Sequence, residues 1–320
     1  MSSFSEATAL KLKDQKQDGS RVYEGLADQD WCIGAVPHGG YVLALLVGAL
    51  TLDQAQAALP DILHITTHYL RPTAIGPFEV HIKTIRTGKT TCNLSAELRQ
   101  KDVVKVTSHA VFGTMDPASN PGGPNLMLEP PSPLARITPF RTPPASTELI
   151  SQSTLRTKFS DRLNYSRDQT VRDHYQQTQA RDGAGGLEMG AYWSFIDKAE
   201  PMNPAVLSLF ADLFPNALPH MLADLPPSWH PTITMSVEFK FPIPRGTDLR
   251  TLGAFSSMRF VNDPHGRHDV YVEIWTAPGE IASGKPPTNG WRQEQRCLAV
   301  AHQMAMLMPY EVNLRNTSRL

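Results

Sequence analysis

Hydrophobic and polar residues alternate along two stretches of the chain, and each stretch is accompanied by one almost wholly apolar run. A period of two is typical of β-strands with one buried face, and short strands joined by tight turns indicate antiparallel meanders. The apolar runs at 37–50 and 203–214 have the length of helices. The predicted strands are 62–71, 78–86, 90–99 and 103–113 in the first stretch and 188–197, 232–241, 248–260, 267–277 and 295–308 in the second.

The first apolar run, 37–50, predicts a helix that is buried on every side and begins at its proline. A helix start carries unpaired N–H groups and a partial positive charge, and glycines let other atoms approach it closely. His38, Gly39, Gly40 and Tyr41 are therefore a candidate site for an anion or a developing oxyanion. The alternative is that the glycines only allow the helix to pack tightly against a neighbouring strand. The run is too short for a membrane span, which needs about 20 apolar residues.

The two stretches are similar enough in sequence to indicate an internal duplication. Residues 69–72, followed by Gly76, match residues 239–242, followed by Gly246, with the same spacing from proline to glycine. Each half is predicted to be an α+β unit in which a curved antiparallel sheet wraps one helix.

A proline-rich stretch separates the two predicted units. Nine prolines lie within 115–148, which is typical of an extended, semi-rigid linker. The predicted domains are therefore 1–114 and 149–320, with 115–148 as the linker between them.

Composition narrows the function classes. A 320-residue chain with a formal net charge of −1 and 41% hydrophobic residues fits a globular protein and does not indicate nucleic-acid binding. The three cysteines are far apart, and no His, Cys or carboxylate group has metal-ligand spacing. The sequence has no Gly-x-Ser-x-Gly motif, so it does not indicate a serine hydrolase. The N-terminus has no signal-peptide pattern. The last residues, Ser318-Arg319-Leu320, are close to the Ser-Lys-Leu peroxisomal address and predict import through its receptor.

Three polar residues in apolar surroundings of the second half are candidates for chemistry. Asp212 lies within the helical run 203–214, where a lone carboxylate is costly unless it is hydrogen-bonded or functional; the alternative is that it is exposed or caps another group. Gln303 lies in an apolar strand, where a buried amide needs partners. Thr232 and Thr234 share one face of a regular strand, so either of them could serve the site, and both could be ordinary strand threonines. His38 and His302 could act as general bases but rank below Asp212.

The chain resembles the acyl-CoA thioesterase II family, whose fold is the double hotdog. The resemblance is carried by Gly39-Gly40, by Tyr69-Leu70-Arg71-Pro72, by Ala211-Asp212-Leu213, by Thr232 and by Gln303. It implies an α+β double-hotdog fold, in which two tandem curved antiparallel sheets each wrap a central helix. It also implies that Asp212, Thr232 and Gln303 hold the hydrolytic water, and that neither a metal nor another cofactor is needed. Some eukaryotic members are peroxisomal, in agreement with the C-terminal tripeptide.

These observations lead to one expected function and two alternatives. We expect hydrolysis of an acyl-CoA thioester in lipid metabolism, with Asp212, Thr232 and Gln303 as catalytic residues and an oxyanion site at Gly39-Gly40. A hotdog-fold enzyme of another class, such as a dehydratase or a biosynthetic cyclase, is the first alternative, because one fold hosts several chemistries. A non-catalytic acyl-binding protein is the second. A homodimer formed through exposed strand edges is a further expectation.

Overall fold

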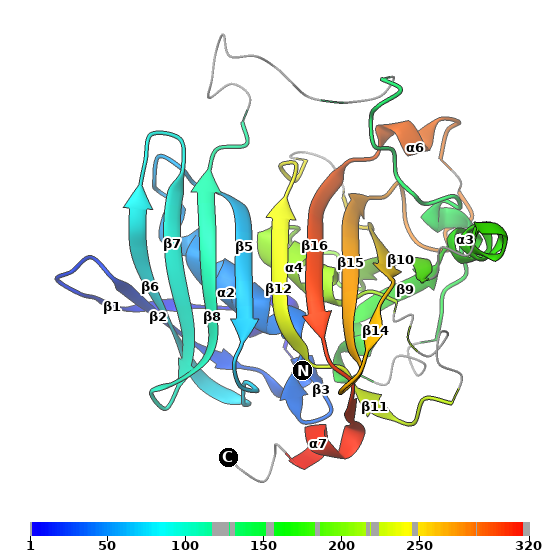
Figure 1. Ribbon diagram of the computed structural model, residues 1–320. Helices are drawn as coiled ribbons and strands as arrows, with labels where there is room; N and C mark the ends of the chain where they lie inside the picture. Colours follow the sequence, from blue (N-terminus) through cyan, green and yellow to red (C-terminus); the bar gives the residue numbers. More distant parts are fainter. Residues whose placement is uncertain are drawn as a thin grey trace.

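The computed structural model describes residues 2–116, 128, 132–151, 157–182, 186–215, 218, 224–244, 249–285 and 287–315. Its centre is a 13-stranded antiparallel sheet that curves around two helices (Figure 1). The strands of the first half are β1 (Lys11–Gln15), β2 (Arg21–Ala27), β5 (Asp61–Tyr69), β6 (Gly76–Thr87), β7 (Cys92–Gln100) and β8 (Val103–Gly113). Those of the second half are β9 (Leu163–Arg167), β10 (Leu187–Phe195), β12 (Thr232–Phe239), β13 (Leu252–Met258), β14 (Val261–Asn262), β15 (Arg267–Thr276) and β16 (Cys297–Ala305).

The strand order confirms the predicted duplication and the double-hotdog fold. The first half is ordered β2-β6-β7-β8-β5 and the second half β10-β13-β15-β16-β12, so corresponding strands occupy corresponding places. The halves join where β5 pairs antiparallel with β12, which makes one continuous sheet. Because each half completes the other's sheet at this seam, the inner faces of both halves enclose one common core.

Two central helices fill the inside of the sheet. They are α2 (Gly39–Gln54) and α4 (Pro204–Asp212), and they pack against each other behind the sheet (Figure 1). Most residues of both helices are buried, as expected for runs that are apolar on all sides. Asn203 caps α4 by accepting a hydrogen bond from the Val206 N–H at 3.0 Å.

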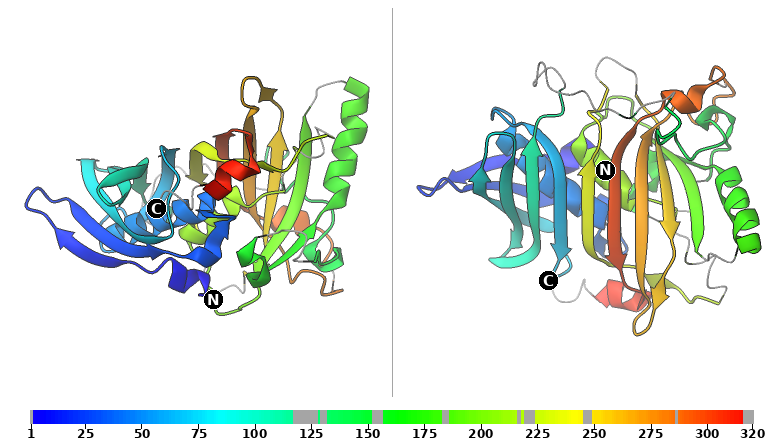
Figure 2. Two further views of the ribbon diagram at one scale, coloured as in Figure 1. Left: turned by 90° about the horizontal axis from the view of Figure 1, so that it is seen from below. Right: turned by 45° about the horizontal axis from the view of Figure 1, so that its top comes forward.

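Smaller elements surround this centre. Helix α3 (Gln169–Asp182), which the apolar pattern does not predict because its sequence is mostly polar, lies beside β10 on the outside of the second half (Figure 2). The others are α1 (Phe4–Ala7), α6 (Trp291–Glu294), α7 (Tyr310–Arg315), and the short pairs β3 (Cys32–Ile33) with β4 (Val36–Pro37) and β11 (Ser228–Trp229) with β17 (Met308–Pro309).

Residues 132–148 of the predicted linker pack on the second half. The Phe140 ring is 1% exposed and contacts the Tyr192 ring at a centroid distance of 4.6 Å. Arg136 forms an ion pair with the buried Glu273 at 2.8 Å. The N–H groups of Arg141 and Thr142 donate to Asp168 at 2.6 and 2.9 Å. This portion of the chain is therefore part of the folded second unit.

The start of α2 differs from the prediction. Pro37 belongs to β4, His38 is the N-cap, and the helix begins at Gly39. Proline was predicted to be the first helical residue, but Pro37 lies opposite Cys32 in the short β3–β4 ribbon. This ribbon sets the direction in which the chain enters the helix.

Candidate functional site

The start of α2 meets the end of α4 at a very short distance, and the two glycines of α2 make this approach possible. A Cβ atom at Gly40 would lie 2.7 Å from the Leu209 carbonyl oxygen and 2.7 Å from the Asp212 Cβ. A Cβ atom at Gly39 would lie 2.7 Å from the Asp212 Oδ2. The predicted tight packing is therefore present, but the partner is the other central helix and not a strand.

The anion at the start of α2 is the Asp212 carboxylate itself. Its Oδ2 accepts a hydrogen bond from the Gly40 N–H at 2.6 Å. Asp212 is the last residue of α4, where the helix dipole disfavours a negative charge, whereas the start of α2 favours one. The side chain is only 8% exposed. The α2 start therefore compensates for the burial of this charge.

Tyr69 holds the same peptide group from its other side, and the pattern of the sequence did not single it out for this role. Its hydroxyl donates to the Gly39 carbonyl oxygen at 2.9 Å, and the N–H of that peptide group, which belongs to Gly40, donates to Asp212. Burial, and secondly the charge of Asp212, raise the pKa of Tyr69, so its hydroxyl stays protonated. Tyr69 therefore orients the peptide that holds the acid.

Thr232 and Gln303 complete a polar cluster around Asp212. The Thr232 hydroxyl lies within donating distance of two acceptors, the Asp212 Oδ1 at 3.2 Å and the Gln303 Oε1 at 2.9 Å. A hydroxyl has one proton, so it serves one of these acceptors at a time and leaves the other open to a water or a substrate. Gln303 is 2% exposed and lies on the inner face of β16. The three residues singled out in the second half are thus in direct contact.

A β-bulge decides between the two candidate threonines. The register of β12 against β16 shifts between Thr232, which lies opposite Ala305, and Thr234, which lies opposite Met304. Ala305 is on the buried face with Gln303, and Met304 is on the other face. The prediction that Thr232 and Thr234 share one face is therefore wrong, because the bulge breaks the period of two. Only Thr232 faces Asp212.

The other candidate residues of the α2 start divide into two groups. His38 is 5% exposed, and its Nε2 lies 3.6 Å from the Asp212 Oδ2. Burial lowers the pKa of His38, although Asp212 opposes this shift, so the ring is neutral at neutral pH. Tyr41 instead points into the core: its hydroxyl donates to the Ala7 carbonyl at 2.7 Å and accepts from the Asp28 N–H at 3.0 Å. The side chain of Tyr41 therefore does not belong to the site, contrary to its prediction as a substrate contact. His302 is exposed and does not belong to it either.

A cavity of about 970 Å³ opens beside the cluster, and its walls come from both halves. It is lined by His38 and Gly39, by Asp212, Thr232 and Gln303, and by many apolar and aromatic side chains. Burial and the neighbouring His268 lower the pKa of His230 in its wall to about 4, so His230 adds no charge at neutral pH. The cationic side chains of this wall at neutral pH are those of Arg71 and Arg167. The arrangement provides a carboxylate, a hydroxyl and an amide at one edge of a mainly apolar space, as in many small-molecule sites.

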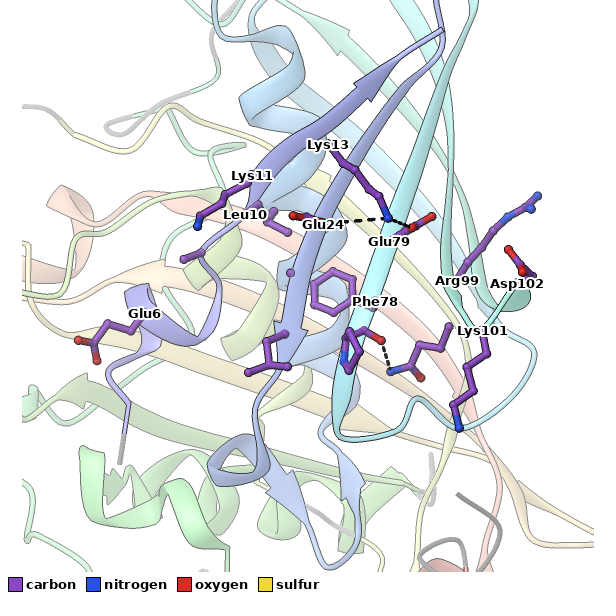
Figure 3. Close-up of a pocket in the computed structure, with 15 residues that line it drawn as sticks. Glu6, Leu10, Lys11, Lys13, Glu24, Phe78, Glu79, Arg99, Lys101 and Asp102 are labelled. Carbon is purple, nitrogen blue, oxygen red and sulfur yellow. Dashed lines mark hydrogen bonds and ion pairs between the residues drawn. The ribbon is translucent and has the colours of Figure 1, made fainter.

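A second cavity, of about 630 Å³, lies between the β1–β2 hairpin and the neighbouring ends of β6 and β7 (Figure 3). Four cations and four carboxylates line it, and Lys13 is bonded to Glu79 and lies 3.9 Å from Glu24. None of the candidate site residues lines this space. Because cations and carboxylates line it in equal numbers, the cavity has no excess of one charge to offer a ligand.

No group of three or more His, Cys, Asp or Glu side chains is placed to hold a metal ion among the residues described. No helix among them has both the length and the apolar character required to cross a membrane.

Comparison with known proteins agrees with this fold. Residues 27–113 match the model of the acyl-CoA thioesterase N-terminal domain, a range that runs from the end of β2 to the end of β8. The chain is 24% identical to the thioesterase-like protein TwmA of Talaromyces wortmannii, over 99% of this chain and 94% of that protein.

Solved structures extend the similarity to the whole chain. The acyl-CoA thioesterase II TesB2 of Mycobacterium marinum superposes with a TM-score of 0.63 at 14% identity, over 97% of this chain and 100% of that chain. A conserved hot-dog-fold protein of unknown function from Alicyclobacillus acidocaldarius gives a TM-score of 0.69 at 18% identity, over 95% and 97%. The predicted resemblance to the thioesterase II family is thus confirmed: the chain has the double-hotdog fold, and residues 27–113 match the acyl-CoA thioesterase N-terminal domain.

Proposed function

We propose that the protein hydrolyses an acyl-CoA thioester to the free acid and CoA, with Asp212, Thr232 and Gln303 as catalytic residues. One observation carries this proposal. A buried carboxylate and an amide from two different elements both lie within hydrogen-bond distance of the hydroxyl of a third, at the edge of the large cavity. Such a cluster is suited to hold the water that attacks the thioester carbonyl carbon in hydrolysis.

In the proposed reaction Asp212 acts as the general base. A water held by Asp212 and Gln303 gives one proton to the Asp212 carboxylate while its oxygen attacks the thioester carbonyl carbon. The tetrahedral intermediate then breaks at the carbon–sulfur bond. The leaving thiolate takes the proton from Asp212, which restores the carboxylate and releases CoA and the acid. The Thr232 hydroxyl can donate to either acceptor and so keeps the Asp212 carboxylate and the Gln303 amide next to each other.

The oxyanion site is proposed at the Gly39 N–H. The Gly40 N–H, which was predicted to share this role, already donates to Asp212. The Gly39 N–H has no acceptor among the described residues, and Gly39 lines the cavity. At a helix start this donor lies in a positive field, which stabilises negative charge on the carbonyl oxygen.

The phosphates of CoA are proposed to bind at Arg71 and Lys105, near the cavity. Arg71 lines the cavity, is exposed, and donates to the Val104 carbonyl at 3.1 Å. Partial burial, and then the charges of Arg71 and Lys101, lower the pKa of Lys105. Neither Arg71 nor Lys105 forms an ion pair with any residue that the structure describes. Cations that lack carboxylate partners and repel each other favour an anionic ligand.

Reversing the charge of Arg71 tests this binding site. The Arg71→Glu variant is expected to raise KM for acyl-CoA about tenfold and to leave kcat unchanged, because the phosphates do not take part in the chemistry. The measurement is steady-state hydrolysis at low ionic strength, where surface charges are least screened. Acyl-pantetheine, which lacks these phosphates, should be hydrolysed equally by both proteins. Arg86→Glu, an exposed arginine of β6 that does not line the cavity, is the control.

Because the bulge in β12 turns Thr232 and Thr234 to opposite faces, we expect their replacement to affect kcat differently. Thr232→Val is expected to lower kcat about tenfold or more, because Asp212 and Gln303 lose the hydroxyl between them. Thr234→Val, the same substitution on the opposite face, should stay within about twofold of the parent. Both kcat values are measured under saturating acyl-CoA. Equal losses in the two variants would contradict the assignment of Thr232.

The function itself is tested with a panel of acyl-CoAs that differ in chain length, by following release of the free thiol. Turnover of at least part of the panel is expected, with loss in the Asp212 variant described in the Discussion. Tight binding of every acyl-CoA without release of thiol would instead favour a non-catalytic acyl-binding protein.

The distance of 3.6 Å between His38 and Asp212 favours one alternative, a dehydratase that acts on a 3-hydroxyacyl thioester. Such a reaction needs a base that removes the Cα proton and an acid that protonates the leaving hydroxyl at Cβ, and a His–carboxylate pair facing the cavity could supply them. The two reactions are separated by replacing His38 with Asn. A thioesterase of the proposed kind retains more activity in this variant than in the Asp212 variant, and a dehydratase loses its activity.

Two further proposals concern where and with what the protein works. We propose peroxisomal import through Ser318-Arg319-Leu320, which lies outside the described residues, and a role in lipid metabolism there. A fluorescent protein that carries this tripeptide, compared with one that lacks the final leucine, tests the targeting. Homodimerisation is proposed through β1, an edge strand whose five residues are all exposed. Light scattering on the full chain measures the assembly.

A further inference from the structure

One wall of the large cavity contains hydrogen-bond donors, several of which have no acceptor among the described residues. It is formed by Tyr165 and Arg167 on β9 and by Trp193 on β10, which lie on the inner face of the sheet. Trp193 lies directly opposite Tyr165 in the β9–β10 pairing. Leu213 and Phe214, which follow the catalytic acid in the chain, line the same cavity. The wall is therefore part of the space beside Asp212.

The Trp193 indole N–H is a buried donor without an acceptor. The side chain is 2% exposed, and its Nε1 has no hydrogen-bond partner among the described residues. The ring is held from two sides: it stacks on Tyr165 at a centroid distance of 4.2 Å and lies 6.2 Å from the ring of Phe210. A buried polar group without a partner is costly, and this one belongs to a side chain that lines the cavity.

Arg167 adds a positive charge to the same wall. Its guanidinium lies 5.6 Å from the centroid of the Tyr165 ring, and its Nε donates to the Tyr165 hydroxyl at 2.7 Å. No carboxylate lies within ion-pair distance of Arg167 in the described part of the chain. A guanidinium has five N–H donors and no acceptor, so most of its donors remain available on the inner face of the sheet.

The wall therefore has donors but few acceptors. Burial raises the pKa of Tyr165, although Arg167 opposes this shift, so its hydroxyl also keeps its proton at neutral pH. A bound saturated hydrocarbon chain would leave the indole N–H and the guanidinium without a hydrogen-bond acceptor. A carboxylate or ketone oxygen on the acyl group would accept from donors of this kind, and the stacked aromatic rings would pack against the carbon chain next to it.

We propose that the Tyr165–Arg167–Trp193 wall selects acyl groups that carry a carboxylate or ketone oxygen beyond the thioester over saturated acyl groups of the same length. This inference rests on the proposed thioesterase function and identifies its substrate class. The wall acts through binding and takes no part in the bond-breaking step, which belongs to the cluster around Asp212.

The test compares ω-carboxyacyl, ω-keto-acyl and saturated acyl thioesters over a series of matched chain lengths. For the parent protein, kcat/KM for the oxygenated acyl thioester should exceed that for the saturated one of the same length by about tenfold or more, at the chain length that is hydrolysed best. Trp193→Phe keeps the aromatic ring and removes the N–H. It should lower kcat/KM about tenfold for that substrate and change the saturated one little. Arg167→Met should lower kcat/KM most for the ω-carboxyacyl thioester. A parent without this preference, or variants that lose both substrate types equally, would overturn the proposal.

Trp31→Phe is the matched control for the indole. Trp31 is also a fully buried tryptophan whose Nε1 has no partner among the described residues, but it does not line the cavity. Its replacement should leave the ratio of oxygenated to saturated turnover unchanged. A shift of this ratio as large as that in Trp193→Phe would assign the effect to loss of a buried indole in general and would overturn the proposal.

Two further measurements identify the group that the wall binds and test the wall without turnover. If the wall binds the CoA phosphates, the effects of Trp193→Phe and Arg167→Met disappear with acyl-pantetheines, and the proposal is overturned; if it binds the acyl oxygen, they persist. If no thioester is hydrolysed, the proposed function fails, but calorimetry with the free dicarboxylic and saturated acids still tests the wall. Tighter binding of the dicarboxylic acid to the parent than to Trp193→Phe would support it, and equal binding would overturn it.

Discussion

Asp212→Asn is expected to lower kcat for acyl-CoA hydrolysis about a thousandfold, the magnitude typical of a lost general base. The amide has the same shape as the carboxylate, and its oxygen can still accept from the Gly40 N–H, which now donates at 2.6 Å. It cannot take a proton from water. KM should change little, because the acid contacts the water and not the CoA. Steady-state hydrolysis over the acyl-CoA panel measures both constants.

The control for this variant is Asp14→Asn on the exposed edge strand β1, which should match the parent. The thermal midpoint of Asp212→Asn should remain close to that of the parent, which separates loss of chemistry from loss of folding. Retention of the parent kcat in a folded Asp212→Asn protein would remove the proposed mechanism.

Gly40→Ala is expected to be the most destabilising single-methyl change in the central helices, at about 2–4 kcal/mol of unfolding free energy. The added Cβ would lie 2.7 Å from the Leu209 carbonyl oxygen and 3.1 Å from that of Ser208, and both are backbone atoms of α4. Backbone in a packed helix cannot move aside as a side chain can, so the two helices must separate. The shift would also break the hydrogen bond to Asp212 and thereby abolish turnover. Urea unfolding and the hydrolysis assay measure the two losses.

Gly48→Ala provides a control within the same helix. Its added Cβ would meet only the flexible Leu10 side chain, at 3.6 Å. Alanine is a better helix former than glycine, so this variant should be neutral or more stable by about 0.5–1 kcal/mol. Equal stability of Gly40→Ala and the parent would show that the two helices can move apart without cost.

Much of the fold follows from local patterns. Strands such as β7 have the period of two that marks a half-buried sheet, and the helices near Gly40 and Asp212 are apolar on all sides because they fill its interior. The repeat predicts the matching strand orders of the halves. Helix α3 is the main omission, since a mostly polar surface helix lacks the apolar stripe that such patterns detect.

Asp212 and Gln303 are recognisable because each is a polar group in apolar surroundings, and the paired glycines are recognisable because they open an apolar helix. Tyr69 does not stand out, because a tyrosine at the end of a strand is ordinary, and its role depends on a peptide 30 residues away. Arg167 and Trp193 are equally inconspicuous in sequence, and their shared wall exists only because β9 pairs with β10.

The sequence alone therefore determined the elements, their duplication and the polar residues that burial makes costly. The tertiary structure decided which of these residues meet. The bulge before Thr234 turns Thr232 inward, the packing of α2 on α4 brings Gly40 to Asp212, and the core takes up the Tyr41 side chain. The physical reason is that periodicity reports how a segment is buried, whereas a contact between two segments depends on register and on close approach, which a local pattern does not encode.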